Sequence, residues 1–281
     1  MAKNTTRKPP IRRKSSKKKK SALLFRIVLI TFLLFGFLYG SYHYRNAIRY
    51  YLSSKSDRIA KEDKFVKDRI IQILKSHKDL TFGFDVSQFQ GNINWDEVNS
   101  AKNKFPLKFV IIRASAGSDK RDSRFSENWS QAKKYDFIRG AYHYYRPNEN
   151  SIQQANNFIK VVSLHSGDLP PVLDIEKLPE NQSIDSLKVG LKRWLNIVDS
   201  HYKVRPIIYT GEKYYNDFLK EEFKGYTFWI ANYNFFVENI NDDWLFWQFT
   251  QKAKINGIDE YVDVNIYNGT PKMLQYLTIS N

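Results

Sequence analysis

The chain has 281 residues, with 45 Lys and Arg against 29 Asp and Glu, and it contains no cysteine. The lack of cysteine excludes a disulfide scaffold, a thiol nucleophile and a Cys-ligated zinc site. A hydrophobic content of 42% argues against a wholly disordered chain. The net charge of +16 suggests a nucleic-acid partner, so the position of that charge has to be considered.

Most of the positive charge lies in an N-terminal tail. Residues 1–20 carry ten Lys and Arg and no acid, whereas residues 45–281 carry 34 basic and 29 acidic side chains. A nearly balanced body weakens the case for a phosphate-binding surface. We therefore expect no nucleic-acid partner, and we interpret residues 1–21 as a basic cytoplasmic tail.

The apolar segment 22–44, ALLFRIVLITFLLFGFLYGSYHY, follows this tail. At about 1.5 Å per residue a helix of this length extends about 35 Å, which is enough to cross a bilayer. The positive charges before it predict a cytoplasmic N terminus and an outward body. We predict an uncleaved transmembrane signal anchor in contact with membrane lipid. A cleaved signal peptide is the alternative.

Residues 45–79 are highly charged, with apolar residues at helical spacing. These include Val66, Ile70, Ile73 and Leu74, and no Gly or Pro interrupts the segment between Ser41 and Leu80. The pattern predicts a helical stem. Two alternatives stay open at this point: the stem extends away from the membrane, or it packs on the body.

In residues 80–281, apolar runs rich in β-formers alternate with polar stretches of helical character. The strand candidates are Thr81–Val86, Phe109–Ala114, Gly140–Tyr145, Pro171–Ile175, Pro206–Tyr209, Thr227–Ala231, Leu245–Phe249 and Tyr261–Val264. The helix candidates are Trp95–Asn103, Ser126–Tyr135, Ser151–Leu164, Ser183–Tyr202 and Lys213–Leu219. Strand–helix–strand order is typical of parallel βαβ units. The gaps shorten after Trp229, so we predict an α/β barrel with regular early units and a hairpin-like end.

Four acidic residues lie at the ends of predicted strands: Asp85, Asp174, Glu176 and Asp263. In a barrel of this kind the strand ends line the active site. Asp174 and Glu176 are two residues apart, so their side chains point to the same side of the strand. Like charges held in one cleft raise the proton affinity of one member, which allows acid and base roles to be divided. No acidic or histidine grouping has convincing metal-ligand spacing, and no phosphate-binding glycine pattern occurs, so no metal and no cofactor are expected.

A series of segments in the body occurs in an order that resembles a known family. The segments are GFDVSQFQGNINWDEV (83–98), FVIIRASAG (109–117), DSRFSENWSQAKKYDFIRGAYHYYRP (122–147), QANNFIKVV (154–162), LPPVLDIE (169–176), RPIIYTG (205–211), WIANY (229–233), WQFT (247–250) and VDVNIYNG (262–269). Together they resemble glycoside hydrolase family 25, the Chalaropsis-type lysozymes or N-acetylmuramidases.

The resemblance implies a distorted TIM-like barrel of eight strands and fewer helices. It also implies hydrolysis of the β-1,4 bond between N-acetylmuramic acid and N-acetylglucosamine in peptidoglycan. By this resemblance Glu176 matches the proton donor, and the other cleft carboxylates match Asp174, Asp85 and Asp263. The positions that match the sugar cleft are Tyr142, Tyr144, Trp229, Tyr233 and Gln248. Asn232 departs from the family pattern, which often has a basic residue there.

The expected chemistry divides roles between two carboxyl groups. Glu176, neutral in an aromatic-lined cleft, would protonate the glycosidic oxygen while Asp174 stays ionised. Asp174 would either attack the anomeric carbon or steady the substrate's own N-acetyl group, and the sequence leaves both open. The cleft aromatics have an alternative interpretation as core residues. His143 alternates to the opposite face of its strand from Tyr142 and Tyr144, which favours a buried structural histidine.

The combined expectation is a membrane-anchored peptidoglycan hydrolase that remodels the wall of its own cell. It would lie in the bacterial cytoplasmic membrane, with a catalytic domain at residues 80–281 on the outer side and peptidoglycan glycan strands as its partner. Any partner among the envelope machinery is unidentified. The alternative from another class is a catalytically inactive, membrane-tethered peptidoglycan-binding module.

Overall fold

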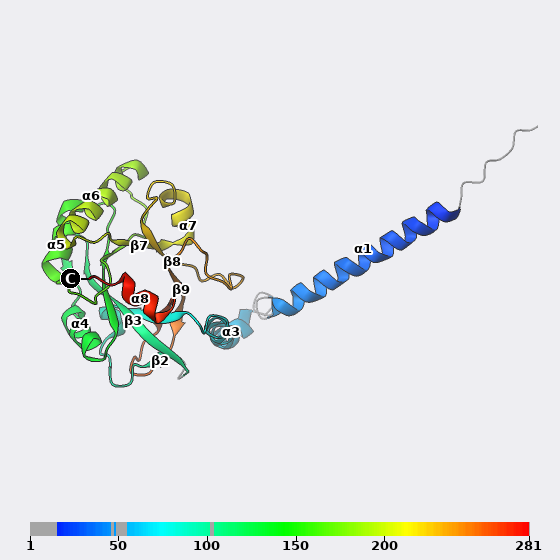
Figure 1. Ribbon diagram of the computed structural model, residues 1–281, viewed down its shortest axis with the longest axis horizontal. Helices are drawn as coiled ribbons and strands as arrows, with labels where there is room; N and C mark the ends of the chain where they lie inside the picture. Colours follow the sequence, from blue (N-terminus) through cyan, green and yellow to red (C-terminus); the bar gives the residue numbers. More distant parts are fainter. Residues whose placement is uncertain (1–15, 46–47, 49–54, 102–103, 281) are drawn as a thin grey trace, which may run out of the picture. The chain divides into compact units, whose positions relative to one another are not determined.

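The computed structural model describes residues 16–45, 48, 55–101 and 104–280, and the chain divides into two compact units, Met1–Lys61 and Glu62–Asn281. In the first unit, helix α1 (Ser16–His43) contains the apolar stretch Leu24–His43 of 20 residues, with a mean hydropathy of 2.0 and no part of it buried (Figure 1). Among the described residues this is the one helix long and apolar enough to cross a membrane. A signal sequence has the same character.

The second unit is a closed barrel of eight strands, as predicted (Figure 1). The strands are β1 (Thr81–Val86), β3 (Phe105–Ala116), β5 (Ile138–Tyr144), β6 (Val172–Asp174), β7 (Ile207–Gly211), β8 (Thr227–Ala231), β9 (Phe246–Ala253) and β10 (Val262–Tyr267). They follow the order β1-β10-β9-β8-β7-β6-β5-β3, and the parallel pairing of β1 with β3 closes the ring. Only β10 runs antiparallel to its neighbours β1 and β9 within this ring, which gives the hairpin-like end.

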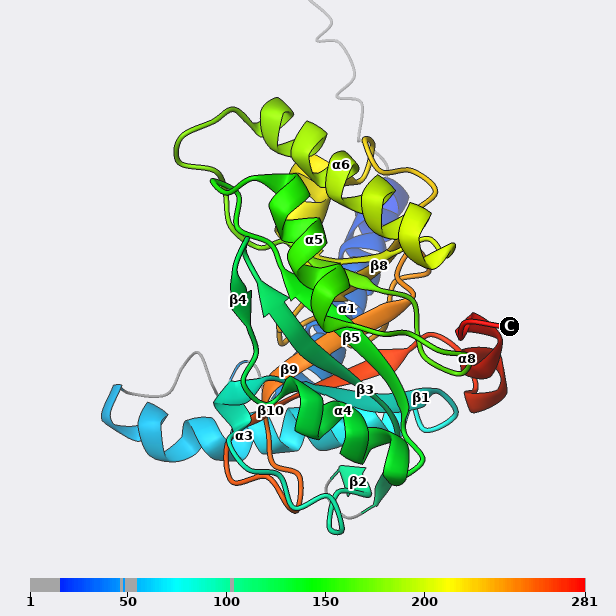
Figure 2. The same ribbon diagram turned by 90° about the vertical axis from the view of Figure 1, so that its left-hand side faces the viewer.

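Helices cover the outside of the barrel, and Figure 2 shows α4, α5 and α6 along one side of it. These helices are α4 (Phe125–Lys134), α5 (Ser151–Val161), α6 (Ile184–Tyr202), α7 (Glu212–Tyr214) with the following π-turn η2 (Tyr215–Leu219), and the C-terminal α8 (Pro271–Leu277). The Asn150 side chain caps α5 by accepting from the backbone N–H of Ile152 at 2.9 Å. Ser183 caps α6 by accepting from the N–H of Ser186 at 3.1 Å. Both caps satisfy donors that the first turn leaves without partners.

The helix predicted at Trp95–Asn103 is wrong for residues 95–101, and its last two residues lie outside the described part of the chain. The structure has turns there, followed by the short strand β2 (Ser100–Ala101), which pairs with β3; β4 (Lys120–Arg121) pairs with β3 further along. The N–H of Asn94 donates to the carbonyl of Gly257 at 2.8 Å, and the N–H of Val98 donates to the carbonyl of Trp95 at 3.2 Å. Trp95 is buried against Phe84 and Phe137. These tertiary contacts hold the segment in turns, so the local helical pattern is overridden.

Alternation along the strands sorts the core into two layers. Inside the barrel lie Phe109, Ile111, Val172, Ile207, Phe246 and Tyr267, with Leu274 from α8. Their neighbours in sequence, such as Val110, Leu173 and Ile208, belong to the larger core between barrel and helices. The phase of the alternation therefore decides which side chains reach the barrel axis.

Helix α3 (Lys55–Ser76) enters the larger core with its C-terminal half. Ile70, Ile73 and Leu74 are each at most 1% exposed there. Of the two alternatives for the stem, the structure therefore shows packing on the body for this part of the segment. The expected division of the chain at residue 80 stays a prediction, although the body's core includes these residues before it.

Candidate active site

The four predicted carboxylates lie at one end of the barrel. Asp174 is the last residue of the parallel strand β6, and Asp85 is the last but one of β1. Asp263 is near the start of β10, which runs the other way, and the register pairs Asp263 directly with Asp85. Glu176 follows Asp174 after the outward, fully buried Ile175. The barrel topology thus collects four acids that are up to 178 positions apart in the sequence.

Asp85 and Asp263 form a coupled pair. Asp85 is 6% exposed, and its Oδ2 accepts from Gln248 Nε2 and Asn265 Nδ2, both at 2.8 Å. Burial raises the pKa of Asp85 well above its usual value, and the Asp263 charge raises it further. Burial also raises the pKa of Asp263, to about 6, while its hydrogen bond with Asp85 opposes this. Of the two, Asp85 is therefore the carboxyl group whose protonated form is favoured more strongly, because its burial is more complete and the Asp263 charge lies beside it.

Asp174 is buried beside a positive charge. Burial raises its pKa well above the usual value, the charges of Glu176 and Asp85 add to this, and Arg113 opposes it. Its Oδ1 has no hydrogen-bond partner within the described part of the chain. A buried carboxylate oxygen without a partner is costly, so it marks a place where a bound group would gain a contact.

Glu176 is exposed at the edge of the barrel mouth. Its pKa is nevertheless raised, chiefly because neighbouring groups desolvate it, while a hydrogen bond with Tyr209 and the charge of Lys177 oppose the shift. A raised pKa favours the protonated form of Glu176, and a carboxylic acid that reaches solvent is placed to donate its proton to a ligand in the cleft.

The predicted sugar-binding residues divide into two groups. Tyr142 and Tyr144 lie half-buried at the end of β5, and Tyr144 pairs in register with Asp174. Tyr233 is 39% exposed, and its hydroxyl donates to Gln248 Oε1. Gln248 and Trp229 are both 2% exposed, so they lie within the barrel. Contact between sugar and any of these five residues stays a prediction.

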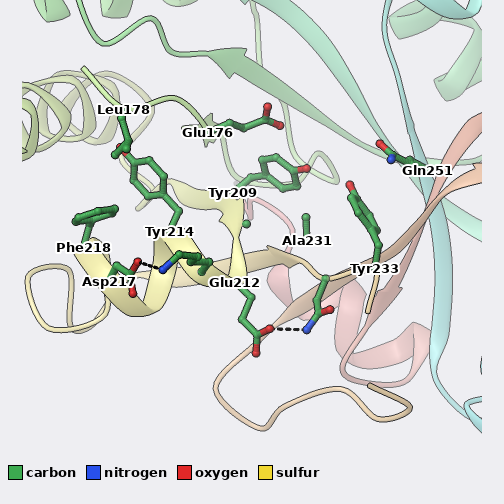
Figure 3. A pocket seen from close by; sticks show the side chains of 13 residues that line it. Glu176, Leu178, Tyr209, Glu212, Tyr214, Asp217, Phe218, Ala231, Tyr233 and Gln251 are labelled. Atoms are coloured by element: carbon green, nitrogen blue, oxygen red, sulfur yellow. Dashed lines mark hydrogen bonds and ion pairs between the residues drawn. The ribbon is translucent and has the colours of Figure 1, made fainter. Parts of the chain in front are cut away.

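A cleft of about 700 Å³ begins at Glu176 and extends over β7 and β8 to α7 and η2 (Figure 3). It is lined by Glu176, Leu178, Tyr209, Gly211, Glu212, Lys213, Tyr214, Asp217, Phe218, Ala231, Asn232, Tyr233 and Gln251. In Figure 3 the Tyr209 ring lies in the middle of the lining, with Tyr214 on one side of it and Tyr233 on the other. Asn232, the departure from the family pattern, is buried and donates from Nδ2 to Glu212 Oε2 at 2.6 Å. In this chain an amide and an acid therefore form that part of the wall.

Three residues of the site were not found from the sequence. Tyr209 donates its hydroxyl to Gln248 Oε1 at 2.7 Å, and Asn265 accepts at Oδ1 from Trp229 Nε1 at 2.8 Å. Arg113 donates from Nε to Asp122 at 2.8 Å, and its guanidinium lies 4.6 Å from the ring centre of Phe89, which is 70% exposed. The available signal was alternation: Arg113 follows the inward Ile111 by two residues, and Asn265 follows Asp263 by two.

His143 lies on the outward side of β5, as its alternation predicted. Its ring stacks on Trp194 with the centres 5.5 Å apart, and its Nδ1 is 2.8 Å from Ser115 Oγ. Burial lowers its pKa to about 4. A neutral histidine in this position is part of the packing between barrel and helices.

Paired carboxyl groups at the mouth of an α/β barrel, beside an aromatic-lined cleft, are the arrangement that glycoside hydrolysis requires. The sequence profile described as "Glycosyl hydrolases family 25" matches residues 84–258, and the chain belongs to this family.

Relatives and solved structures agree with this assignment. Lysozyme M1 of Streptomyces globisporus is 34% identical over 208 residues, which cover 68% of this chain and 69% of that protein. The N,O-diacetylmuramidase of Chalaropsis sp. is 30% identical over 146 residues, covering 48% of this chain and 67% of that protein. A family 25 glycosyl hydrolase structure from Bacillus anthracis superposes with a TM-score of 0.64 at 28% identity, covering 72% of this chain and 95% of that chain.

Proposed function

We propose that this glycoside hydrolase is a muramidase, which cleaves the β-1,4 bond from N-acetylmuramic acid to N-acetylglucosamine in peptidoglycan. The observation that carries the proposal is the close set of Asp174, Glu176 and the Asp85–Asp263 pair at the barrel mouth. Family membership supports it, because similar proteins are named lysozyme M1 and N,O-diacetylmuramidase.

In the proposed reaction Glu176 protonates the glycosidic oxygen. The raised pKa of Glu176 favours the protonated form that a general acid needs, and its exposed position lets a substrate in the cleft reach it. Asp174 lies deeper in the site than Glu176 and acts either as the nucleophile or by holding the substrate's N-acetyl group. Asp174 acts in its ionised form, which burial disfavours and which the positive charge that develops at the anomeric carbon favours. Arg113 assists that ionisation.

The Asp85–Asp263 pair organises the floor of the site. Asp85 fixes the amides of Gln248 and Asn265, and Gln248 in turn accepts from Tyr209 and Tyr233. Hydroxyl groups at the cleft surface are thus oriented by buried amides. We propose that the sugar lies over Tyr142 and Tyr144 on one side and Tyr233 on the other, with Trp229 beneath.

The test is mass spectrometry of products released from purified peptidoglycan. The wild-type chain should release fragments with a muramic-acid reducing end, and Glu176→Gln should reduce the rate by at least about 100-fold. Glu180→Gln, an exposed acid in the following loop, serves as the control and should keep wild-type activity. A glucosamine reducing end would contradict the proposed bond. Binding to peptidoglycan without any release would favour the inactive binding module.

We also propose that the apolar part of α1 stays uncleaved and anchors the chain in the bacterial cytoplasmic membrane, with the barrel on the outer side. Its length, its hydropathy and the basic tail before it support this. The C-terminal half of α3 belongs to the body's core, so we expect the anchored enzyme to act on wall close to the membrane. Membrane fractionation with sequencing of the mature N terminus tests the anchor. A chain found in the medium and beginning near residue 41 would show a cleaved signal peptide instead.

A further inference from the structure

Helix α3 is joined to the loop between β8 and β9 (residues 232–245) by a buried arginine. Arg69 donates from one terminal nitrogen to the carbonyl of Phe249 at 2.8 Å. The other terminal nitrogen donates to the carbonyls of Asn234 at 2.8 Å and Val237 at 3.2 Å. One guanidinium on α3 therefore binds both the β8–β9 loop and strand β9.

The hydrogen bonds of Arg69 are buried and are donated by a charged group, and both properties make them rigid. Arg69 is 8% exposed, and although burial lowers its pKa to about 10, it keeps its charge at neutral pH. Hydrogen bonds from a charged donor are stronger than neutral ones, and the planar fork of arginine fixes their directions. The next turn of α3 is held by Ile70, Ile73 and Leu74 in the core, so the helix stays docked without help from the guanidinium.

A second contact at the surface joins the same two elements. Gln72 Nε2 donates to Glu238 Oε1 at 2.9 Å. The His77 ring, just after α3, meets Trp247 edge-on with the ring centres 5.8 Å apart. Trp247 Nε1 donates to the carbonyl of Asn232 at 3.0 Å. Three separate contacts thus connect the region around α3 with the loop or with its first residue.

The loop held in this way forms a wall of the cleft. Asn232 and Tyr233 both line it. Asn232 accepts at Oδ1 from the N–H of Asn234, the residue whose carbonyl binds Arg69, and it donates to Glu212 across the cleft wall. Tyr233 donates to Gln248, which donates to Asp85. A displacement of the loop at Asn234 would therefore also move Asn232 in the cleft wall and the hydroxyl group of Tyr233.

We propose that Arg69 is a positioning residue, through which α3 fixes the β8–β9 loop and so sets the substrate-binding wall of the cleft. The matched region of the family begins at residue 84, so α3 lies outside it. Helix α3, which precedes the matched region in the sequence, then contributes to the geometry of the glycan site. The effect on glycan cleavage rests on the proposed function, whereas the effect on the loop does not.

The experiment compares full-length Arg69→Gln with Arg139→Gln in detergent. Arg139 is a matched control, because it is 5% exposed and donates to Asp168 and to the carbonyl of Trp129, both at 2.7 Å, at the start of β5. Hydrogen–deuterium exchange is measured over residues 232–245, together with KM and kcat on soluble peptidoglycan fragments. Gln72→Ala, a change at an exposed position that leaves the core of the fold untouched, supplies a second variant.

Arg69→Gln should speed exchange in residues 232–245 at least tenfold and raise KM several-fold, with a smaller change in kcat. Gln72→Ala should give the same pattern more weakly, and Arg139→Gln should leave loop exchange and KM at wild-type values even where it lowers Tm. Unchanged loop exchange in Arg69→Gln would overturn the proposal, as would equal KM changes in the two arginine variants. A wild-type chain that cleaves nothing would instead refute the proposed function, and the exchange data would still decide whether Arg69 holds the loop.

Discussion

The two ends of the barrel interior are built from the same strands and have opposite chemistry. At one end the inward residues of β6 and β9 are Val172 and Phe246, which pack in the apolar core. Two positions further along each strand, the inward residues are Asp174 and Gln248 at the other end. About 6–7 Å along a strand therefore separates the apolar side chains that pack in the barrel from the polar side chains of the candidate site.

The two ends also differ in what they contribute to stability. The apolar end removes large aromatic surfaces from water, with Phe246 against Phe109 and Tyr267 at ring-centre distances of 5.4 and 5.2 Å. The polar end holds acids whose pKa values are raised by burial, and it includes a carboxylate oxygen without a partner in the described structure. The apolar end therefore stabilises the fold, whereas the buried acids of the polar end lower its stability and serve the chemistry of the site.

The largest effects are expected from replacing an aspartate by asparagine at each of the two ends of the barrel. Asp174→Asn should lower kcat by at least about 100-fold, because it removes charge beside the reacting carbon. Its Tm should stay equal or rise, since a costly buried acid is lost. Asp168→Asn should do the reverse, because it leaves Arg139 buried without its carboxylate and costs about 3–5 kcal/mol. Thermal melting and turnover measured well below Tm check both.

Equal changes in Tm and in turnover for these two variants would contradict the division of roles between the two ends of the barrel. A loss of stability in Asp174→Asn equal to that in Asp168→Asn would show that the polar end also supports the fold. A loss of turnover in folded Asp168→Asn would show that the apolar end takes part in catalysis.

A cavity at the apolar end should act on stability alone. Phe246→Ala should cost about 3–5 kcal/mol of unfolding free energy, while the folded molecules keep their kcat. Phe246→Leu refills much of the space and should recover most of the loss. Chemical denaturation with activity assays on the folded fraction measures both quantities. A change in kcat larger than the change in folded fraction would contradict the separation.

The sequence was sufficient to predict the eight strands and their closure into a barrel. Runs such as Phe109–Ala114 and Thr227–Ala231 are strongly apolar and β-branched or aromatic, so tertiary packing and local propensity agree there. At Trp95–Asn103 they disagree, because Trp95 anchors a turn that local periodicity cannot reveal. The apolar stripe of α3 predicted a covered face, but it could not indicate whether the barrel or another surface covers it.

The candidate site was predictable where an unusual residue marks a strand end. Asp85, Asp174, Glu176 and Asp263 are conspicuous at the ends of predicted strands, and the family resemblance added the roles expected of them. Tyr209 and Arg113 were missed because alternation shows which residues of a strand share a face, as Arg113 does with Ile111, but does not show which face is inward. Barrel closure and register decide that direction, and neither can be obtained from a single strand.

The polar end should also give the barrel a specific pH dependence. The pKa of Asp263 is about 6 in the folded protein against an ordinary 3.8, so between these values the folded state keeps a proton that the unfolded state has released. The stabilisation from this proton is present below about pH 4 and is lost as the pH rises through 6. Between pH 4.5 and 7 the Tm of the wild type should therefore fall by a few degrees relative to the Tm of Asp263→Asn. A difference that is constant with pH would contradict the raised pKa.

The smallest effect is expected at the edge of the polar end, where one hydroxyl is removed. Tyr233→Phe loses the hydrogen bond to Gln248 Oε1 and keeps the ring that faces the cleft. One hydrogen bond is worth about 0.5–1.5 kcal/mol, so KM should rise about two- to tenfold while Tm changes little. Tyr276→Phe on α8, where the side chain is 78% exposed, is the control and should change neither value. If Tyr233→Phe instead lowered Tm as strongly as Phe246→Ala, the hydroxyl network above the carboxylates would belong to the fold, and the boundary between the two ends would have to move outward to the cleft surface.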